Sequence, residues 1–512
     1  MYGVKSSKHP LFTKEWIIYF VAGLCSVLLS IWAALKTSVI NPDAVCYLQS
    51  AQTLHLGLTS AMHVCGQARW PFYSVLIFGV ASITDFSCLT AAFCLNGLFS
   101  LISVITFVAI IRLLTPAVRL AWLAVVVILL AHEFNSLRTE IIRDHGYWAF
   151  YLLSLFFFLR FWQLSAERFY FAIFWSISLI IATLFRIEGA AFLLLLPLAV
   201  FLDSRVAFGA RIKSFFQLNA VTLFILFVIV FWVMLHPAFQ LSRLSEVQFQ
   251  LLHGLSEMSK HYTQASEALA QHVLSGYAAR DAGLILFVML VGWYIVSVIS
   301  NVSFAYAVLI VYAWYKKIAN LTQDARLVLW MYVLVNVLIT SMFLVDNMFL
   351  AKRYLIALSL ILMLWVPFAL HYLIQQWSVR KWPVMLALFL IVLCGISGIV
   401  DFGYSKKYIR DAGVWLAVNA PEDAKIYSND LQVLYYSNHF GNVIFAKEKE
   451  FVDMNVIKQD KWRQYDYLAL QITKQDLNKS FGVLQEIRQQ PVVVFHNKRG
   501  DRVIIYQVKI RK

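Results

Sequence analysis

Long runs of apolar residues, with few Pro or Gly residues inside them, dominate the chain. A helix needs about 20 such residues to cross a hydrocarbon core of about 30 Å. The runs do not alternate between apolar and polar positions, as the strands of a membrane barrel would. We therefore predict membrane-spanning helices near residues 16–36, 87–112, 118–133, 146–163, 168–185, 189–203, 217–236, 282–315, 327–345, 354–375 and 382–401.

Basic residues give these helices an orientation. Lys5, Lys8 and Lys14 precede the first span, so the positive-inside rule places the N-terminus in the cytoplasm. The first apolar run lacks a small-residue cleavage site, which predicts a retained signal anchor. We interpret residues 282–315 as one long tilted span, because this keeps the following lysines on the cytoplasmic side. The stretch 71–84 is too short to cross, and we expect it to lie along the membrane or to re-enter it.

Eleven spans place the C-terminal tail outside the cytoplasm. Residues 237–281 form an outer connection with the pattern of an amphipathic helix. Beyond residue 401 the composition becomes that of a soluble protein: a helix, a Pro turn and a strand precede three strands, YDYLALQI, PVVVFHN and DRVIIYQVKI. We predict a membrane domain at 1–401 and an extracytoplasmic α/β domain at 402–512.

Composition supports a membrane protein and narrows its partners. The chain is 61% hydrophobic and 14% charged, which a water-soluble fold could not bury. The net charge of +15 is expected from cytoplasmic Lys and Arg, so we predict no nucleic-acid partner. Six cysteines include no pair or Cys/His set at zinc spacing. Only Cys46 and Cys65 lie in the same outer loop. The sequence leaves open whether they form a disulfide or stay unlinked.

Four groups of polar residues lie at the predicted outer ends of spans, and the predicted orientation of the spans does not explain why they are there. Because all four fall on one side of the membrane, we expect a shared cavity. In chain order the groups are Asp43 with Tyr47; Arg138, Glu140, Arg143, Asp144 and His145; Arg186 with Glu188; and Asp346, Lys352, Arg353 and Tyr354.

Each group also has a structural interpretation. Asp43 fits an N-cap, because it follows Pro and precedes a helical run. The other structural interpretations are an interfacial pair for Arg143 and Asp144, a tight-turn pair for Arg186 and Glu188, membrane-boundary anchors for Lys352 and Arg353, and ordinary loop residues for His55 and His63.

The residue types favour one chemistry. A carboxylate at the membrane–water boundary can deprotonate an acceptor hydroxyl as it attacks an anomeric carbon. A phosphate leaving group at the same depth needs cations, and Arg binds phosphate oxygens through a two-pronged contact. A second carboxylate could orient the acceptor or hold a divalent cation. The pattern indicates transfer of a sugar from a lipid phosphate.

Short motifs carry a family resemblance. The pattern PDxxxYxxxA, formed by Pro42, Asp43, Tyr47 and Ala51, followed by WP and a second span, resembles the GT-C superfamily of glycosyltransferases. The segments RDHG at 143–146, FRIEG and KRY fit the same pattern. Within that superfamily, the chain resembles the bacterial protein O-mannosyltransferases and the aminoarabinose transferase of lipid A, which are glycosyltransferase families 39 and 83. This resemblance implies an all-α polytopic membrane fold of about 11 to 13 transmembrane helices with a small C-terminal α/β domain.

The resemblance also implies roles for residues. Asp43 matches the catalytic base, Asp144 matches an acidic residue of the second outer loop with Glu140 as its rival, and Arg353 matches a residue that holds the lipid phosphate. The predicted substrate-binding residues are Tyr47, Glu140, Arg143, His145, Lys352, Arg353 and Tyr354. Asp43 is followed by Ala44, whereas protein mannosyltransferases have paired acids there, so the acceptor class stays open. The tail has no WWD motif, so we expect no block transfer to Asn.

The resulting hypothesis is a bacterial inner-membrane enzyme with a periplasmic C-terminal domain. It would transfer a sugar, with inversion, from a polyprenyl-phosphate donor to lipid A or lipopolysaccharide, another envelope glycan, or a protein. The alternative is a membrane transporter or lipid flippase, although the charges gather at one face and no half-repeat is visible. We predict no certain cofactor; Mg²⁺ or Mn²⁺ bound through Asp43 and Asp144 is an open alternative, whereas a tight zinc site would need His or Cys ligands.

Overall fold

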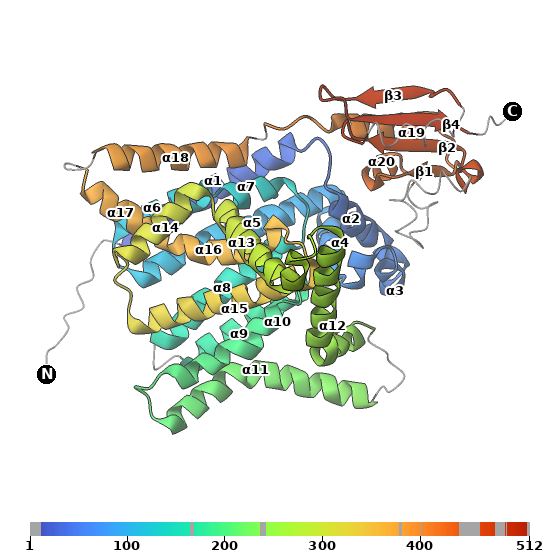
Figure 1. Cartoon of the computed structure of the whole chain (residues 1–512). Helices are drawn as coiled ribbons and strands as arrows, with labels where there is room; N and C mark the ends of the chain where they lie inside the picture. Colours follow the sequence, from blue (N-terminus) through green and yellow to red (C-terminus); the bar gives the residue numbers. More distant parts are fainter. Residues whose placement is uncertain are drawn as a thin grey trace, which may run out of the picture. The chain divides into compact units, whose positions relative to one another are not determined.

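The computed structural model describes residues 12–163, 168–235, 242–377, 381–400, 402–439, 461–476, 487 and 489–508. Lys5, Lys8 and the first residues of the predicted 237–281 connection lie outside these ranges. The chain divides into two compact units (Figure 1). Unit 1 comprises Met1–Leu29, Gly97–Leu137 and Arg143–Val400, and unit 2 comprises Ser30–Asn96, Arg138–Ile142 and Asp401–Lys512.

Unit 1 is helical. Two helices, α1 (Phe12–Lys36) and α5 (Cys88–Leu114), have residues in both units. The helices that lie wholly in unit 1 are α6 (Val118–Leu129), α7 (His132–Ser136), α8 (Asp144–Gln163), α9 (Arg168–Phe185), α10 (Gly189–Leu195), α11 (Phe208–Leu235), α12 (Ser242–His272), α13 (Ala282–Val302), α14 (Phe304–Tyr315), α15 (Gln323–Asn347), α16 (Lys352–Leu362), α17 (Val366–Gln375) and α18 (Lys381–Ile399).

The predicted all-α, multi-pass membrane fold is confirmed, but with fewer spans than expected. Within the described residues, 8 helices are long and apolar enough to cross a membrane, or 9 if one bent pair counts as a span. The prediction was about 11 to 13. Part of the difference lies in the short apolar helices Gly189–Leu202 and Phe304–Tyr315. Another part lies in α8, which carries Asp144, His145 and Arg160 within its 20 residues.

Two predicted spans are broken. The single tilted helix over 282–315 is wrong, because α13 and α14 meet at Ser303, whose φ of 76° is far from helical. The span over 118–133 bends by 55° between Val118–Leu129 and His132–Thr139. A continuous apolar run satisfies the length rule whether or not its backbone is straight, so hydropathy does not reveal these breaks.

The α8–α9 pair is the part of unit 1 that positions the candidate site. These two helices pack against each other, α8 also packs against α15, and α9 against α11 (Figure 1). A Cβ added to Gly146 would overlap the ring of Phe185, so only glycine allows this close approach. The start of α8 therefore lies against the end of α9, and the two helices run antiparallel.

Unit 2 contains the small sheet. Its strands are β1 (Ile426–Ser428), β2 (Tyr467–Ile472), β3 (Val493–His496) and β4 (Arg502–Gln507), in the order β1-β2-β4-β3. The pair β1–β2 is parallel and the other pairs are antiparallel. Helices α19 (Lys407–Asn419) and α20 (Leu431–Tyr436) pack together, and α19 also contacts β3 and β4. The predicted helix and four strands are confirmed, because alternating apolar residues between turn signals are a strong local signal.

The first outer loop belongs to the same unit. Its helices are α2 (Pro42–Thr53), α3 (Leu58–Met62) and α4 (Phe72–Thr84), and α2 packs against both α4 and α20. The backbone N–H of Ile40 donates to the Tyr436 hydroxyl at 3.0 Å, and the Gln432 amide donates to the Ile40 carbonyl. The loop and the C-terminal sheet therefore form one body, which the sequence pattern does not indicate.

Candidate functional site

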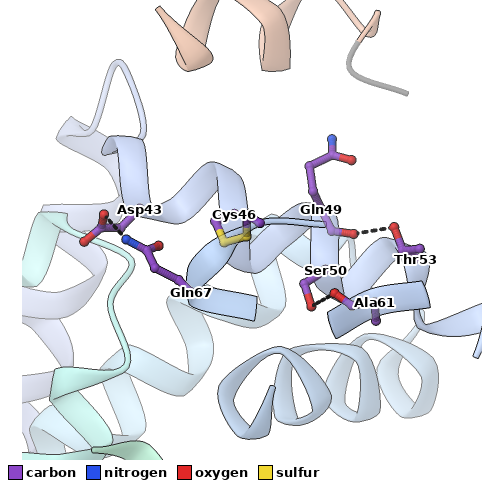
Figure 2. Close-up of a disulfide and its surroundings, with 8 residues drawn as sticks. Asp43, Cys46, Gln49, Ser50, Thr53, Ala61 and Gln67 are labelled. Carbon is purple, nitrogen blue, oxygen red and sulfur yellow. Dashed lines mark hydrogen bonds between the residues drawn. A yellow bond between two sulfur atoms is a disulfide. The ribbon is translucent and has the colours of Figure 1, made fainter. Parts of the chain in front are cut away.

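The first outer loop is cross-linked by a disulfide between Cys46 and Cys65, whose Cα atoms are 6.0 Å apart (Figure 2). Both cysteines are buried with Ala68. The Ser50 hydroxyl adds a second link by donating to the Ala61 carbonyl at 3.1 Å. Of the two alternatives left open by the sequence, the structure has the disulfide.

Asp43 lies in the first turn of α2, but it is not the N-cap. That position belongs to Asn41, so the capping interpretation of Asp43 is wrong. Its Oδ1 accepts a hydrogen bond of 2.7 Å from Nε2 of Gln67 (Figure 2). Gln67 follows the disulfide-bonded Cys65 by two residues, so the cross-link holds the amide beside the half-buried carboxylate.

Tyr47 lies in the core of unit 2. Its ring packs edge-on against Tyr73 with centroids 5.2 Å apart. The Tyr73 hydroxyl donates to Asn96 at 2.7 Å, and the Asn96 amide donates to the backbone carbonyl of Glu140 at 2.9 Å. This chain of contacts ties α2 to Glu140, and the predicted substrate roles of Tyr47 and Glu140 stay predictions.

The loop histidines are exposed. Nδ1 of His55 lies 2.5 Å from the Gln52 carbonyl, and Nδ1 of His63 lies 2.7 Å from the Thr59 carbonyl. Such contacts within one helical turn are those of ordinary loop and turn residues.

In unit 1, one arginine joins two carboxylates from different elements. Nη1 of Arg186 donates to Oδ1 of Asp144, and Nη2 donates to Oε1 of Glu188. The side chains of Arg186 and Asp144 are 7% and 3% exposed, and that of Glu188 is 24% exposed. The tight-turn interpretation of Arg186 and Glu188 is therefore incomplete, because the pair also binds Asp144 at the start of α8.

The charges in this cluster stabilise one another. Burial alone would lower the pKa of the Arg186 guanidinium, but Asp144 and Glu188 outweigh that effect and raise it. Burial opposes ionisation of Glu188, yet the Arg186 charge and hydrogen bond lower the pKa of this carboxyl below its usual value. Arg143 adds to that lowering. The pKa shifts of Arg186 and Glu188 therefore both favour the charged forms.

Aromatic rings connect this cluster to the start of α16. The guanidinium carbon of Arg186 lies 4.3 Å from the centroid of the Tyr354 ring and 5.8 Å from that of Tyr147. The guanidinium carbon of Arg353 lies 5.4 Å from the same Tyr354 ring. Phe343 packs on Tyr354 with centroids 4.4 Å apart. Two arginines therefore share one ring.

A pocket of about 370 Å³, counted with the solvent at its open side, lies over these groups. One part of its lining is polar, and Ile339 and Phe343 give it an apolar part. The lining residues are Tyr147, Arg186, Glu188, Asn336, Ile339, Thr340, Phe343, Arg353 and Tyr354. Of these, Arg353 and Tyr354 were predicted site residues, whereas Arg186 and Glu188 were noticed in the sequence but left out.

Lys352 makes a different contact. Its Nζ lies 2.5 Å from Oε1 of Glu133, whose side chain is 5% exposed. The Lys352 carbonyl accepts from Asn301 at 2.7 Å, and Asn301 in turn accepts from the Ser359 hydroxyl at 2.6 Å. These bonds fix the first turn of α16, and with it Arg353 and Tyr354. Sequence reasoning missed Glu133, whose only signal is a carboxylate at the end of an apolar run.

His145 is buried rather than open to the pocket. Its Nε2 lies 3.1 Å from the Leu137 carbonyl, and its ring packs edge-on against Trp148 at 4.9 Å. Among the predicted residues of unit 1, the structure therefore brings together Asp144, Arg353 and Tyr354, through Arg186.

The acids considered for a metal ion make other contacts in the structure. Within the described ranges, no group of three or more His, Cys, Asp or Glu side chains could hold an ion. Oδ1 of Asp144 and Oε1 of Glu188 both accept hydrogen bonds from Arg186. The acids that the sequence offered for Mg²⁺ or Mn²⁺ thus have other contacts, since Asp43 accepts from Gln67.

No protein-family model and no curated protein matches the sequence. Solved structures do match. The archaeal oligosaccharyltransferase AglB from Archaeoglobus fulgidus, in complex with an inhibitory peptide and a dolichol-phosphate, is 12% identical; the match covers 96% of this chain and 74% of that one, with a TM-score of 0.55. A structure of the Archaeoglobus fulgidus oligosaccharyltransferase with zinc and sulfate matches at 12% identity, 95% and 72% coverage and a TM-score of 0.53.

ArnT from Cupriavidus metallidurans, bound to undecaprenyl phosphate, matches along nearly its whole length. It is 13% identical, and the match covers 97% of this chain and 98% of that one with a TM-score of 0.57. At such identities the likeness is one of fold. The fold of this chain is therefore shared with AglB and ArnT.

Proposed function

We propose that this chain is an inverting glycosyltransferase that moves a sugar from a polyprenyl-phosphate donor to an acceptor outside the cytoplasm. The observation that carries the proposal is the pocket lined by Arg186, Glu188, Arg353 and Tyr354, in a fold shared with AglB and ArnT. The structures of those two proteins contain dolichol-phosphate and undecaprenyl phosphate, respectively. The acceptor would be lipid A or lipopolysaccharide, another envelope glycan, or a protein.

Arg353 is the residue we assign to the lipid phosphate. Lys352 is paired with the buried Glu133, and Arg186 is neutralised by two carboxylates. Arg353 lines the pocket beside the Tyr354 ring. A guanidinium can form two parallel hydrogen bonds to phosphate oxygens and can stabilise the charge that develops as the phosphate leaves. The apolar side chains of Ile339 and Phe343 would contact the first prenyl units.

We assign the acceptor proton to Asp43. In the proposed step the acceptor hydroxyl oxygen forms a bond to the anomeric carbon while the bond from that carbon to the phosphate oxygen breaks. The phosphate leaves with the electron pair, and Asp43 takes the hydroxyl proton. The configuration at the anomeric carbon is inverted. Gln67 would hold the carboxylate in one orientation through its hydrogen bond.

The test is sugar transfer from a labelled polyprenyl-phosphate sugar by the purified full-length chain and by Asp43→Asn, with donor binding recorded in parallel. We expect the variant to bind the donor and to lose about a hundredfold or more in transfer, the range of a general base. Asp85→Asn is the matched control, because Asp85 is an exposed residue of the same unit. Unchanged transfer by Asp43→Asn would refute the assignment of Asp43. Absence of both transfer and donor binding in the wild type would refute the transferase itself and favour the transporter alternative.

A further inference from the structure

A second pocket lies at the other end of the α8–α9 pair. Its volume is about 270 Å³, counted with the solvent at its open side. The lining includes Phe161 and Trp162 from the end of α8, Arg168 from the start of α9, and Arg211 from α11. The 14 residues from Tyr147 in the first pocket to Phe161 in the second span about 21 Å of helix. Topology predicted from the basic residues puts this end on the cytoplasmic side.

Two hydrogen-bond donors in this pocket lack acceptors. Nε1 of Trp162 and Nε of Arg168 are buried and have no hydrogen-bond partner among the residues that the structure describes. Trp162 as a whole is 7% exposed. A buried donor without an acceptor is costly, so native proteins leave few of them. Two such donors in one pocket indicate an acceptor that comes from outside the chain.

The positive charge of the pocket is only partly offset by its own acid, Asp203. Across the described ranges, neither Arg168 nor Arg211 makes an ion pair. Nε of Arg211 donates to the Val206 carbonyl at 2.7 Å and Nη1 to the Phe201 carbonyl at 3.3 Å, which fixes the direction of the guanidinium. Arg168 lies over the Phe161 ring at 5.6 Å.

The acid in the lining is already engaged. Oδ1 of Asp203 accepts from Nε of Arg205 at 2.7 Å, and these hydrogen bonds lower the pKa of the Asp203 carboxyl. Arg205 also bonds Asp324. Asp203 also interacts through space with Arg211. Arg168 is therefore the pocket arginine that no described carboxylate faces, and the charged residues of the lining, Arg168, Arg211 and Asp203, leave a net positive charge.

We propose that this pocket binds the phosphate group of an anionic phospholipid from the cytoplasmic leaflet. Phosphate oxygens would accept from Trp162, Arg168 and Arg211, and the apolar side chains of Val200 and Val206 in the lining suit the glycerol and acyl part. Basic pockets between membrane helices on the cytoplasmic side are sites of this kind. The proposal is independent of sugar transfer, because it concerns the opposite end of the helix pair.

The experiment is native mass spectrometry of the purified full-length chain in neutral detergent, titrated with phosphatidylglycerol, cardiolipin or phosphatidylcholine. We expect the two anionic lipids to be retained and phosphatidylcholine to be lost. The variant Arg168→Gln/Arg211→Gln should bind phosphatidylglycerol about tenfold more weakly, because charge-assisted hydrogen bonds are removed. Arg160→Gln is the matched control, since Arg160 also lies over a ring, that of Phe156, but is outside the pocket lining; it should bind as the wild type does.

Three outcomes would overturn the proposal. The double variant could bind phosphatidylglycerol as tightly as the wild type, or Arg160→Gln could lose as much, which would indicate a diffuse charge effect. Inorganic phosphate at equal concentration could displace the lipid, which would assign the pocket to a free anion. Should the glutamine variant fail to elute as a single species, Arg168→Lys/Arg211→Lys replaces it; this variant keeps the charge but loses the forked donors, and we expect about threefold weaker binding.

Discussion

Both ends of the α8–α9 pair have arginines: Arg186 at one end is buried, whereas Arg168 and Arg211 at the other are half-buried, and the contacts they make differ. At the Asp144 end, Arg186 is held by two carboxylates from the same unit. At the Phe161 end, Arg168 and Arg211 have ring and carbonyl contacts instead. A buried charge needs a partner, whether the chain supplies it or a ligand does. The first end is therefore complete in itself, whereas the second is completed by binding.

This difference predicts which end depends on its arginine for stability. Arg186→Gln would leave Asp144 and Glu188 without their cation, and removal of one partner from a buried ion pair costs about 3–5 kcal/mol. Arg168→Gln removes a charge that no described carboxylate faces, so we expect a change within about 0.5 kcal/mol. Thermal unfolding in lipid-free neutral detergent measures both. Equal losses in the two variants would mean that the comparison is wrong.

The sequence was informative where signals are local and silent where they are not. The strands of unit 2 and the amphipathic helix α12 follow from short patterns and were predicted. The bend between α6 and α7 and the break at Ser303 were not, because a few polar residues within a long apolar run do not show where the backbone leaves the helix. Arg186 was left out of the predicted site because a local pair with Glu188, two residues later, accounts for its charge. Its other partner, Asp144, lies 42 positions away in the sequence. Glu133 lies 219 positions from Lys352, and no local pattern joins them.

Variants of the neighbouring Arg353 and Lys352 would show which of the two binds the lipid phosphate at the Asp144 end. Arg353→Gln should weaken binding of the polyprenyl-phosphate donor about tenfold, because a charge-assisted contact to phosphate is lost. Lys352→Gln should change donor affinity less and stability more, since it removes the lysine paired with the buried Glu133, which keeps only its contacts with Ser136 and His132. Donor titration and thermal unfolding of both variants separate these effects. The reverse order would assign the phosphate to Lys352.

The pH dependence of stability distinguishes a buried ion pair from an exposed one. The pKa of Glu188 is lowered in the folded chain, so its ionised form stabilises the fold above the usual carboxyl pKa of about 4.3, and this is lost as the pH falls through the lower folded value. The wild type should therefore exceed Glu188→Gln in stability at neutral pH, and the gap should narrow in acid.

Asp203→Asn provides the comparison at the second end. The pKa of Asp203 is also lowered, by Arg205, so the sign is the same. The Arg205 side chain is 45% exposed, so salt should reduce the stability difference between the wild type and Asp203→Asn. The stability difference between the wild type and Glu188→Gln should persist in salt. Unfolding midpoints at low and high NaCl check this. A salt-sensitive Glu188 gap would contradict burial of the cluster.

The smallest effect expected is that of Trp162→Phe. The substitution keeps an aromatic ring but removes an Nε1 donor that has no partner within the described chain, so stability in lipid-free detergent should change by no more than about 0.5 kcal/mol. With phosphatidylglycerol present, the wild type should gain more in unfolding temperature than the variant, because only the wild type can donate this bond to the lipid phosphate. The lipid-dependent difference is the informative quantity, since a ring that only packs would lose the same stability with and without lipid. An equal loss under both conditions would make Trp162 a packing residue and would leave the two arginines as the only donors at that end.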